Sequence, residues 1–409
     1  MDVRINPGPL SGAVTPPPSK SMAHRLLLAA ALAEGVSTVR NVALSQDIEA
    51  TLRCVTALGC HWVQIESDVV RIRGIGGKSA DRGGELLHFD CGESGSTLRF
   101  LIPIALAAAG GGVFTGRGRL MERPQKPYFD LFEEKGIFYR MKDGELTVRG
   151  SLPCGEYRLP GNVSSQFFTG LLFALPLLDG DSTVVSSTAL ESSNYLAMTV
   201  GALRTAGVSV SFQPERRLCQ VSSGRFKPFD ASVEADWSQA AFWYAANVLG
   251  GDLRIGGLNP LSSQGDRSIA EYAEILSRSG DAEIDVSGCP DLVSPLAVMA
   301  AVRQGTTHLT NAARLRLKES DRLKTTAAMV NALGGRAEEG TDSLTIHGVP
   351  RLTGGTVDGA NDHRIVMAAA IAAAGCSGPV TILGAEAVNK SYPSFFKDYL
   401  ALGGDANGV

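Results

Sequence analysis

The sequence contains few of the residues that build disulfide frameworks or zinc sites. Its 409 residues include seven cysteines and six histidines, with neither a C-x-x-C nor an H-x-x-x-H pair. An odd number of scattered cysteines does not fit a disulfide-stapled secreted domain. The composition therefore indicates reduced thiols in a cytoplasmic protein, and it predicts no bound metal.

Excess charge and long apolar runs are also missing. The formal net charge is −4, so the chain lacks the basic footprint of a protein that binds nucleic acid. The apolar stretches at 167–178 and 365–374 are too short to cross a bilayer, and residues 1–12 lack the apolar core of a signal peptide. With 44% hydrophobic and 20% charged residues, the composition is typical of a soluble globular protein. The length exceeds what one hydrophobic core serves, so we expect two domains.

What the sequence does contain is a sixfold repeat marked by pairs of glycines. In each pair the first glycine follows an apolar run and precedes a β-like segment, and the second follows a further helical run. The members of a pair are 24 to 29 residues apart, and the pairs are Gly35/Gly59, Gly112/Gly136, Gly180/Gly207, Gly251/Gly280, Gly305/Gly334 and Gly378/Gly403. Each repeat reads as a polar cluster, an apolar helix, a strand, an amphipathic helix and a further strand. The polar clusters thus recur where a helix begins, and a helix N-terminus favours anions.

The six repeats predict an α/β protein with two domains of three repeats each. Two segments mark where the domains join: the stiff proline run at 16–18 and the sequence Phe-Lys-Pro-Phe at 226–229. We expect a continuous domain at 16–227 and a discontinuous domain formed by 1–15 and 228–409, to which the N-terminal segment adds a strand. Two close crossovers act as a hinge, so we expect the domains to close around a ligand.

Cations and hydroxyls gather at the helix starts of the first three repeats. The first repeat opens with Lys20 and Ser21, followed by Arg25; cations there oppose the helix dipole, and a bound anion would remove that conflict. Glycines and serines at 92–97 let a ligand approach backbone N–H groups. The third cluster, at 164–166, offers two hydroxyls and an amide. A solvated basic helix end and ordinary capping turns are the alternative interpretations.

The last three repeats add carboxylates to the cations. Asp291 belongs to the repeat that also carries Lys318, Glu319 and Arg322. We expect Lys318 and Arg322, four residues apart, to share one helix face, and a surface salt-bridge face is the alternative interpretation. The sixth repeat again places cations near helix starts, at 361–364 and 390–393.

Taken together, these clusters resemble the enolpyruvyl transferase family. The resemblance covers nearly the whole chain and rests on Ser19-Lys20-Ser21 with Arg25, Gly92 to Arg99, Glu122-Arg123-Pro124, Ser164-Ser165-Gln166, Leu315 to Arg322, Asn361 to Arg364, and Lys390-Ser391-Tyr392-Pro393. It implies a two-domain fold of six βαβαββ repeats, three per domain, with helix N-termini facing the interdomain cleft. It also implies a monomeric shikimate-pathway enzyme without cofactor, which transfers the enolpyruvyl group of phosphoenolpyruvate to the 5-hydroxyl of shikimate 3-phosphate and releases phosphate.

The resemblance also assigns roles to individual residues. Those implied to contact shikimate 3-phosphate are Lys20, Ser21, Arg25, Ser164, Ser165, Gln166, Ser192, Tyr195, Asp291 and Lys318. Those implied to contact phosphoenolpyruvate are Lys20, Gly95, Arg123, Gln166, Arg322, Arg364 and Lys390. Asp291 is implied to accept the proton of the 5-hydroxyl. The protons at the phosphoenolpyruvate methylene and the departing phosphate are implied to be handled by Glu319, Lys20 and His363, and the assignment of each proton stays open.

Two positions depart from the family pattern. Glu93 stands in the glycine-rich turn where asparagine is usual, and Arg314 stands where asparagine is often found ahead of the Leu315 to Arg322 segment. We expect Glu93 to point away from the ligand or to pair with an arginine, and the resemblance assigns no substrate contact to Arg314. The charges of the implied site still fit its ligands. The implied site has seven cations and two carboxylates. Its ligands together carry two phosphates and two carboxylates, with a total charge of about −5 to −6.

Three alternatives compete with this interpretation. The sister enzyme that acts on UDP-N-acetylglucosamine typically has asparagine after the lysine and a loop cysteine, whereas this chain has Ser21 and no cysteine between Cys91 and Cys154. A relative of the RNA 3′-phosphate cyclase type would need nucleotide-handling residues, which we do not find in the sequence. A non-catalytic anion-binding module would not keep Asp291 and Glu319 beside the cations, because carboxylates weaken simple anion binding.

Overall fold

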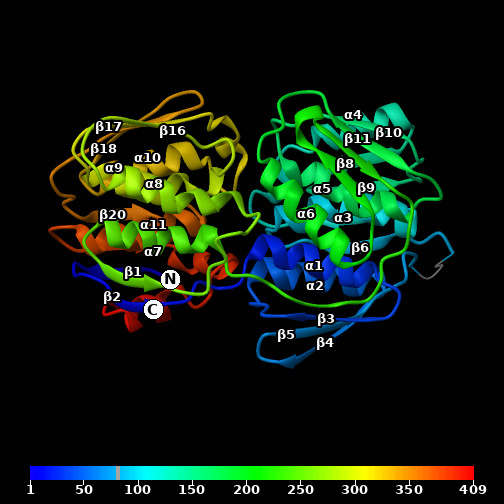
Figure 1. The fold of residues 1–409 in the computed structure, drawn as a ribbon, viewed down its shortest axis with the longest axis horizontal. Coiled ribbons are helices and arrows are strands. Elements are labelled where there is room, and N and C mark those ends of the chain that lie inside the picture. The colour runs from blue at the N-terminus through cyan, green and yellow to red at the C-terminus, as the bar shows by residue number, and fades with distance from the viewer. Residues whose placement is uncertain (80–82) are drawn as a thin grey trace. The chain divides into compact units, whose positions relative to one another are not determined.

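The computed structural model describes residues 1–79 and 83–409, which divide into two compact units. Unit 1 comprises Met1–Pro17 and Ala235–Val409, and unit 2 comprises Pro18–Glu234. Each unit has its own hydrophobic core. The strands nearest the two chain ends pair with each other, so the N- and C-termini lie side by side in unit 1 (Figure 1).

Unit 2 consists of three repeats, each with two helices and a four-stranded sheet. In every sheet the first two strands are parallel, and the spatial order is first, second, fourth, third. The second repeat comprises β6 (Leu87–Asp90), α3 (Gly95–Ala109), β7 (Gly111–Thr115), α4 (Lys126–Lys135), β8 (Phe138–Lys142) and β9 (Glu145–Arg149). The third comprises β10 (Glu156–Leu159), α5 (Ser165–Ala174), β11 (Ser182–Ser186), α6 (Ser193–Thr205), β12 (Val210–Gln213) and β13 (Leu218–Val221).

The first repeat completes its sheet with a strand from the end of the unit. β14 (Asp230–Ser232) lies parallel to β3 (Val36–Arg40) and takes the first-strand position. The rest of the repeat comprises α1 (Lys20–Leu32), α2 (Gln46–Leu58), β4 (His61–Glu66) and β5 (Val69–Arg73). Because β14 pairs with β3, it belongs to unit 2. The domain boundary expected after residue 227 would assign this strand to the other domain.

Two of the three repeats of unit 1 follow the same strand order. The fifth comprises β16 (Ala282–Asp285), α9 (Val293–Val302), β17 (Thr306–Thr310), α10 (Arg322–Ala332), β18 (Arg336–Glu339) and β19 (Leu344–His347). The sixth comprises β20 (Gly355–Asp358), α11 (His363–Gly375), β21 (Val380–Leu383), α12 (Phe395–Ala401), β22 (Asp405–Asn407) and β1 (Val3–Asn6). Here the N-terminal strand β1 fills the fourth position, between β21 and β22.

The fourth repeat is shorter than the other five. It comprises β2 (Ser11–Val14), α7 (Trp237–Val248), β15 (Asp252–Ile255) and α8 (Ile269–Leu276), and its sheet has two parallel strands. The antiparallel pair is missing from the described sheet because α8 ends at Leu276 and β16 already begins at Ala282. The connection between these elements is too short for two further strands.

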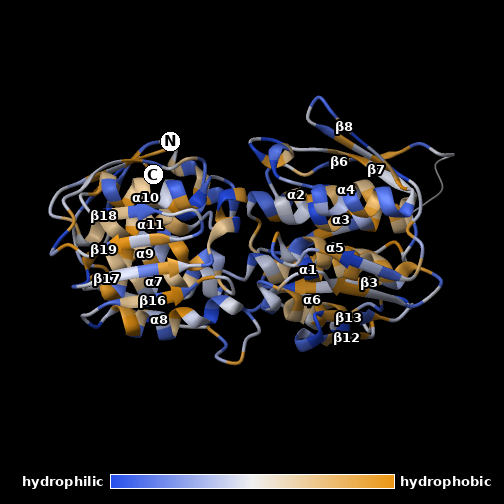
Figure 2. Cartoon of the chain, turned by 90° about the horizontal axis from the view of Figure 1, so that it is seen from above, coloured by the Kyte–Doolittle hydropathy of each residue, from blue (hydrophilic) through white to orange (hydrophobic). Residues whose placement is uncertain are grey.

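The two helices of each repeat differ in sequence and in burial. The first helices, such as α5 and α11, are rich in alanine, leucine and other apolar residues and are buried along almost their whole length. The second helices are amphipathic: α2 buries Ile48, Leu52 and Val55 on one face, as the spacing predicts. Figure 2 shows the hydrophobic colours concentrated on the helices inside each unit, whereas the strands and loops around them carry both hydrophobic and hydrophilic colours.

The second glycine of each pair lies at or shortly after the C-terminal end of the second helix of its repeat. Gly59 and Gly136 are the C-caps of α2 and α4, with φ of 111° and 67°. The corresponding glycines of the other repeats also have positive φ: Gly207, Gly280, Gly334 and Gly403. A side chain is disfavoured in this conformation, which explains why glycine recurs at this place.

Candidate active site

Arg25 lies one turn into α1 and is buried among polar groups of α5 and α6. Its Nε donates to Thr199 Oγ1 (2.9 Å), and its Nη2 donates to Tyr195 O (3.1 Å) and Thr169 Oγ1 (3.4 Å). Its Nη1 donates to Ser21 O at 2.7 Å. Burial lowers the pKa of Arg25 to about 10, so the guanidinium is still charged at neutral pH. The structure therefore brings together Ser21, Arg25 and Tyr195 of the predicted site.

Lys20, the first residue of α1, pairs with a carboxylate that sequence reasoning missed. Its Nζ lies 2.7 Å from Asp47 Oδ2, and the two side chains are 16% and 12% exposed. Asp47 stands in the first turn of α2, the second helix of the same repeat. An acidic residue there is common in any helix, so its sequence position gave no reason to assign it to the site.

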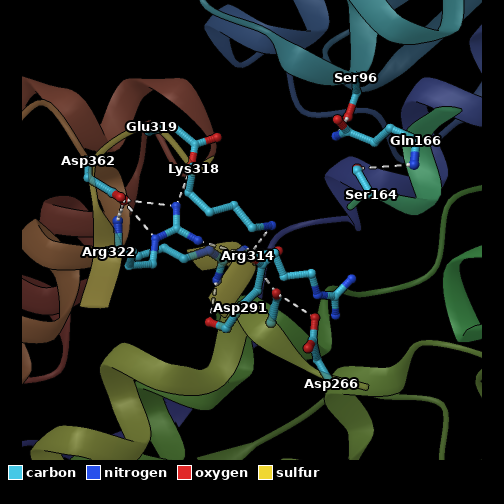
Figure 3. A network of polar contacts seen from close by, with 12 residues as sticks. Ser96, Ser164, Gln166, Asp266, Asp291, Arg314, Lys318, Glu319, Arg322 and Asp362 are labelled. Atoms are coloured by element: carbon cyan, nitrogen blue, oxygen red, sulfur yellow. Dashed lines mark hydrogen bonds and ion pairs between the residues drawn. The ribbon is translucent and has the colours of Figure 1, made fainter. Parts of the chain in front are cut away.

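The starts of α3 and α5 meet through Arg99 and Gln166. Arg99 Nη1 donates to Gln166 Oε1 at 2.8 Å. Gln166 Nε2 donates to Ser96 Oγ at 3.0 Å (Figure 3). Arg99 Nη2 also donates to Pro124 O at 3.0 Å, which holds the loop that carries Arg123. Arg99 therefore braces two predicted segments of the site.

Gly95 and Arg123 are in direct contact. A Cβ atom built on Gly95 would lie 2.6 Å from Arg123 Nη1 and 2.9 Å from its Cζ. Glycine is thus the residue that leaves room for the guanidinium at the first position of α3.

The serines of the third repeat stand at the starts of α5 and α6. Ser164 is the N-cap of α5, and its Oγ accepts from the backbone N–H of Gln166 at 3.3 Å. Ser165 is buried in the first position of the helix. Ser192 precedes α6 in the left-handed region, with φ of 54°, and is also buried.

A buried chain of hydrogen bonds ties the N-terminal turns of α1, α2 and α3 together. His24 Nδ1 lies 2.7 Å from Thr51 Oγ1, which lies 2.7 Å from Thr97 Oγ1, and the Thr97 hydroxyl donates to Ser94 Oγ at 2.8 Å. Burial, assisted by two neighbouring cations, lowers the pKa of His24 well below its usual range. The imidazole is therefore neutral, and it serves this helix junction.

In unit 1, Arg322 is surrounded by three carboxylates (Figure 3). Its Nη1 lies 2.9 Å from Asp291 Oδ1, its Nε lies 2.9 Å from Asp362 Oδ2, and its Nη2 bonds to Glu319. The side chain is 1% exposed. Burial alone would lower the pKa of Arg322, but the charges of Asp362, Glu319 and Asp291 raise it above its usual range. Asp362 belongs to the Asn361 to Arg364 motif but received no role from the sequence; it is fully buried and caps α11.

Asp291, in the 3-10 helix η5 (Pro290–Leu292), forms ion pairs with three cationic side chains. Arg322 Nη1 and Lys318 Nζ lie 2.9 Å and 3.4 Å from its Oδ1, and Arg364 Nη2 lies 3.0 Å from its Oδ2. Burial alone would raise the pKa of Asp291, but Arg364, Lys318 and Arg322 hold it well below its usual range. We call the following residues the unit 1 network: Asp291, Lys318, Glu319, Arg322, Asp362 and Arg364.

The expectation that Lys318 and Arg322 share a helix face is wrong. Lys318 follows the 3-10 helix η6 (Ala313–Leu317) with an extended backbone, and α10 begins only at Arg322. The two cations meet because both reach Asp291, which belongs to another segment of the same repeat. The surface salt-bridge interpretation is also wrong, because the Arg322 side chain is buried.

The remaining predicted residues of unit 1 border this network. Lys390 ends the 3-10 helix η7 (Ala385–Lys390), and its Nζ donates to Asn361 O at 2.7 Å, beside the start of α11. His363 is the first residue of α11 and is buried. Arg314, one of the two departures from the family pattern, donates from Nη2 to Ser287 O.

Glu93, the other departure, is directed toward a neighbouring loop. A Cβ atom built on Gly118 would lie 2.6 Å from Glu93 Oε2, so the carboxylate lies against this glycine. The loop carries Arg117 and Arg119, which form ion pairs with Asp90 and Glu122.

Comparison with known proteins identifies the family to which this arrangement belongs. The family profile described as EPSP synthase (3-phosphoshikimate 1-carboxyvinyltransferase) matches residues 5–399. The chain belongs to the EPSP synthase family. The 3-phosphoshikimate 1-carboxyvinyltransferase of Clostridium kluyveri is 43% identical over 98% of this chain and 97% of its own length. That of Clostridium acetobutylicum is 42% identical over 99% of this chain and 98% of its own length.

Solved structures of EPSP synthase family members and their relatives share the fold. The EPSP synthase of Acinetobacter baumannii matches with a TM-score of 0.80 and 25% identity, over 99% of both chains. The enolpyruvyl transferase NikO of Streptomyces tendae matches with a TM-score of 0.75 and 18% identity, over 99% of this chain and 98% of its own, which shows the fold alone.

Membership of the EPSP synthase family confirms the expected fold, the transferase class and the function in the shikimate pathway. It does not favour the related enzyme that acts on UDP-N-acetylglucosamine. Within residues 1–79 and 83–409, no helix is long and apolar enough to cross a membrane. The same part of the chain holds no group of three or more His, Cys, Asp or Glu side chains suited to a metal ion. The roles of individual residues stay predictions.

Proposed function

We propose that this chain transfers the enolpyruvyl group of phosphoenolpyruvate to the 5-hydroxyl of shikimate 3-phosphate. The observation that supports this most is the Asp291 carboxylate held by Lys318, Arg322 and Arg364. Such a site combines a proton acceptor with cations that bind carboxylates and phosphates. A simple anion-binding site has no use for the carboxylate, whereas removal of a proton from a hydroxyl requires a base, and a carboxylate can serve as one.

The reaction needs three proton transfers as well as bond exchange at one carbon. The 5-hydroxyl oxygen adds to the carbon that carries the phosphate, while a proton adds to the methylene carbon. Loss of phosphate, with a proton from the new methyl group, then restores the double bond. Asp291 takes the hydroxyl proton, and Lys20, Glu319 and His363 are the candidates for the other transfers.

Substrate binding would itself make Asp291 a better base. Without ligand, its three cations keep the pKa of Asp291 well below its usual range, which makes the carboxylate a weak proton acceptor. A bound phosphate or carboxylate that takes over part of the charge of Arg322 and Arg364 raises the proton affinity of Asp291. The base is thus strengthened only when the substrates are present.

The cations divide between the two substrates in this proposal. The phosphoenolpyruvate contacts are Lys20, Gly95, Arg123, Gln166, Arg322, Arg364 and Lys390. The shikimate 3-phosphate contacts are Lys20, Ser21, Arg25, Ser164, Ser165, Gln166, Ser192, Tyr195, Asp291 and Lys318. The firm anchoring of Arg25 and of Gln166 supports this assignment, because a fixed donor loses little entropy when it binds an anion.

Release of phosphate from phosphoenolpyruvate tests the proposal. The purified enzyme is assayed with shikimate 3-phosphate and, in parallel, with UDP-N-acetylglucosamine as the acceptor. We expect phosphate release with shikimate 3-phosphate as the acceptor and none with UDP-N-acetylglucosamine. The reaction should need no added metal or cofactor. No turnover with shikimate 3-phosphate would sink the proposal, and turnover with the nucleotide sugar would assign the chain to the related activity.

We further propose that the enzyme works as a monomer in the cytoplasm. All seven cysteines are free thiols, and six of them are buried, which suits a reducing compartment. Light scattering of the purified enzyme at several concentrations tests the monomeric state, and a mass above that of one chain would contradict it.

A further inference from the structure

In the described residues, five repeats show one contact between the segments that open their two helices. A residue at the start of the first helix touches a residue 27 to 29 positions later, which lies in the first turn of the second helix or in the segment that leads into it. The pairs are Lys20/Asp47, Gly95/Arg123, Ser238/Asp266, Asp291/Lys318 and Asn361/Lys390. Four pairs include residues that the proposed function uses. The pair in the fourth repeat has no assigned role, although it occupies the equivalent place.

Ser238 and Asp266 are linked directly to the unit 1 network. The Ser238 hydroxyl donates to Asp266 Oδ2 at 2.8 Å, and the same hydroxyl oxygen accepts from Arg364 Nη2 at 3.0 Å. Arg364 Nη2 in turn lies 3.0 Å from Asp291 Oδ2. Because Asp266 takes the one hydroxyl proton of Ser238, a lone pair of that oxygen is left to face the guanidinium. The path from Asp266 through Ser238 to Arg364 is buried along its length.

Charged groups from several elements face Asp266, which lies in the 3-10 helix η4 (Gly265–Ser268). The charges are those of Asp291 in η5, Arg364 in α11 and Asp236 at the start of α7. Burial, followed by the charge of Asp291, raises the pKa of Asp266 to about 7, although Arg364 and the Ser238 hydrogen bond act in the opposite direction. Asp266 can therefore gain or lose a proton near neutral pH.

Two further titratable groups on this side stay neutral over that range. Burial raises the pKa of the Cys289 thiol to about 12, and it raises the pKa of Tyr272 in α8 to about 12 as well. Neither group changes its charge between pH 6 and pH 8, so the change near Asp266 comes from the carboxyl itself and from what binds at Arg364.

We propose that Asp266 is a positioning residue for phosphoenolpyruvate: through Ser238 it orients the Arg364 guanidinium, and it takes up a proton from solvent when an anion binds there. This inference rests on the proposed role of Arg364. An anion bound to Arg364 adds negative charge near Asp266 and so increases its proton affinity. By reciprocity, the enzyme with Asp266 protonated binds phosphoenolpyruvate more tightly. Affinity for this substrate therefore falls as the pH rises through the neutral range.

The substitution Asp266→Asn tests the proton. An asparagine oxygen still accepts from Ser238 but cannot ionise. The KM for phosphoenolpyruvate is measured at pH 6, 7 and 8 in the wild type and in the variant. The ratio of the two KM values is used because ionisation of the substrate affects both enzymes equally and cancels. We expect the ratio of wild-type to variant KM to rise at least threefold from pH 6 to pH 8, with a constant ratio for shikimate 3-phosphate. The control is Asp281→Asn. Asp281 is an exposed residue of unit 1 whose carboxylate accepts a hydrogen bond from the backbone N–H of Thr306. The KM values of this variant should equal those of the wild type at each pH.

A second variant, Ser238→Ala, tests the positioning. It breaks the link while both charged groups remain, so we expect the KM for phosphoenolpyruvate to rise about tenfold, the loss of one hydrogen bond to a charged group. The KM for shikimate 3-phosphate should stay within twofold. A flat pH ratio for Asp266→Asn, or an unchanged phosphoenolpyruvate KM for Ser238→Ala, would overturn the inference and leave the proposed function intact. Absence of turnover in the wild type would overturn both.

Discussion

Arg322 Nη1 lies 2.9 Å from Asp291 Oδ1, so a residue proposed to bind phosphoenolpyruvate holds the proposed proton acceptor in its charged form. The arginine is buried and is shared by Glu319 and Asp362 as well. Removal of one of several partners from a buried charge costs less free energy than removal of its only partner. Exchange of the carboxylate for a ligand anion is therefore feasible at Asp291 while Asp362 keeps Arg322 in place.

Replacement of the proposed base should separate binding from turnover. In Asp291→Asn the amide cannot accept the hydroxyl proton, whereas the surrounding cations remain. We expect kcat to fall about 10²- to 10⁴-fold, the usual contribution of a positioned general base. The KM values of both substrates should change by less than about fivefold, because ligand anions replace the lost carboxylate as partners of the cations.

Steady-state kinetics checks this prediction, with Asp281→Asn as the control for the loss of one acidic charge in unit 1. A circular dichroism spectrum and a melting curve confirm that each variant is folded. A kcat within twofold of the wild type would show that Asp291 does not accept the proton.

The contact between Gly95 and Arg123 predicts a selective loss of phosphoenolpyruvate binding. The methyl group of Gly95→Ala would lie 2.6 Å from Nη1, closer than atoms can approach, so the guanidinium must move. We expect the KM for phosphoenolpyruvate to rise about tenfold or more, since one charged contact contributes about 1.5 to 3 kcal/mol. The KM for shikimate 3-phosphate should change little.

Gly201→Ala is the matched control for this substitution. Gly201 lies in α6, and a Cβ atom there would meet no atom within 4 Å. Its kinetics should equal those of the wild type, while its stability should rise by up to about 1 kcal/mol from the gain in helix propensity. Equal phosphoenolpyruvate KM values for the two variants would contradict the role given to Arg123.

The anchoring of Arg25 predicts that lysine cannot replace it. A single ammonium group cannot make the contacts to Thr199, Tyr195 O and Ser21 O that fix the guanidinium. For Arg25→Lys we expect the KM for shikimate 3-phosphate to rise about tenfold, equivalent to about 1.4 kcal/mol. Arg40→Lys changes an exposed arginine that pairs with Asp230 and should have no such effect. If both variants bind shikimate 3-phosphate like the wild type, Arg25 is only a structural residue.

The sequence predicts the repeat architecture well because its signals are local. The second glycine of each repeat is needed where a helix ends with positive φ, as at Gly59, and the apolar spacing of α2 matches its buried face. These features depend on neighbours within one or two turns of chain. The same locality explains why cations and hydroxyls at helix starts can be found without coordinates.

Partners of those residues were not predictable in the same way. Asp47, Asp266 and Asp362 stand at helix starts, where an acidic residue is ordinary and needs no functional reason. Their importance follows from which helix starts meet in space, and this is fixed by tertiary packing. Hydroxyls inside helices, such as Thr51 and Thr169, likewise look like core residues until their hydrogen bonds are seen.

The raised pKa of Asp266 also predicts a pH-dependent effect on stability. An aspartate titrates near pH 3.9 in an unfolded chain, whereas the pKa of Asp266 in the folded protein is about 7. Between these values the folded protein holds a proton that the unfolded chain has released, so this group makes the wild type less stable as the pH rises from about 4 to about 7. Asparagine does not titrate, so the stability of Asp266→Asn relative to the wild type should increase by about 2 kcal/mol from pH 5 to pH 8. Denaturant unfolding at the two pH values measures this difference, with Asp281→Asn as the surface control. A relative stability that stays constant, or that falls as the pH rises, would mean that Asp266 is already ionised at pH 5 and cannot take up a proton near neutral pH.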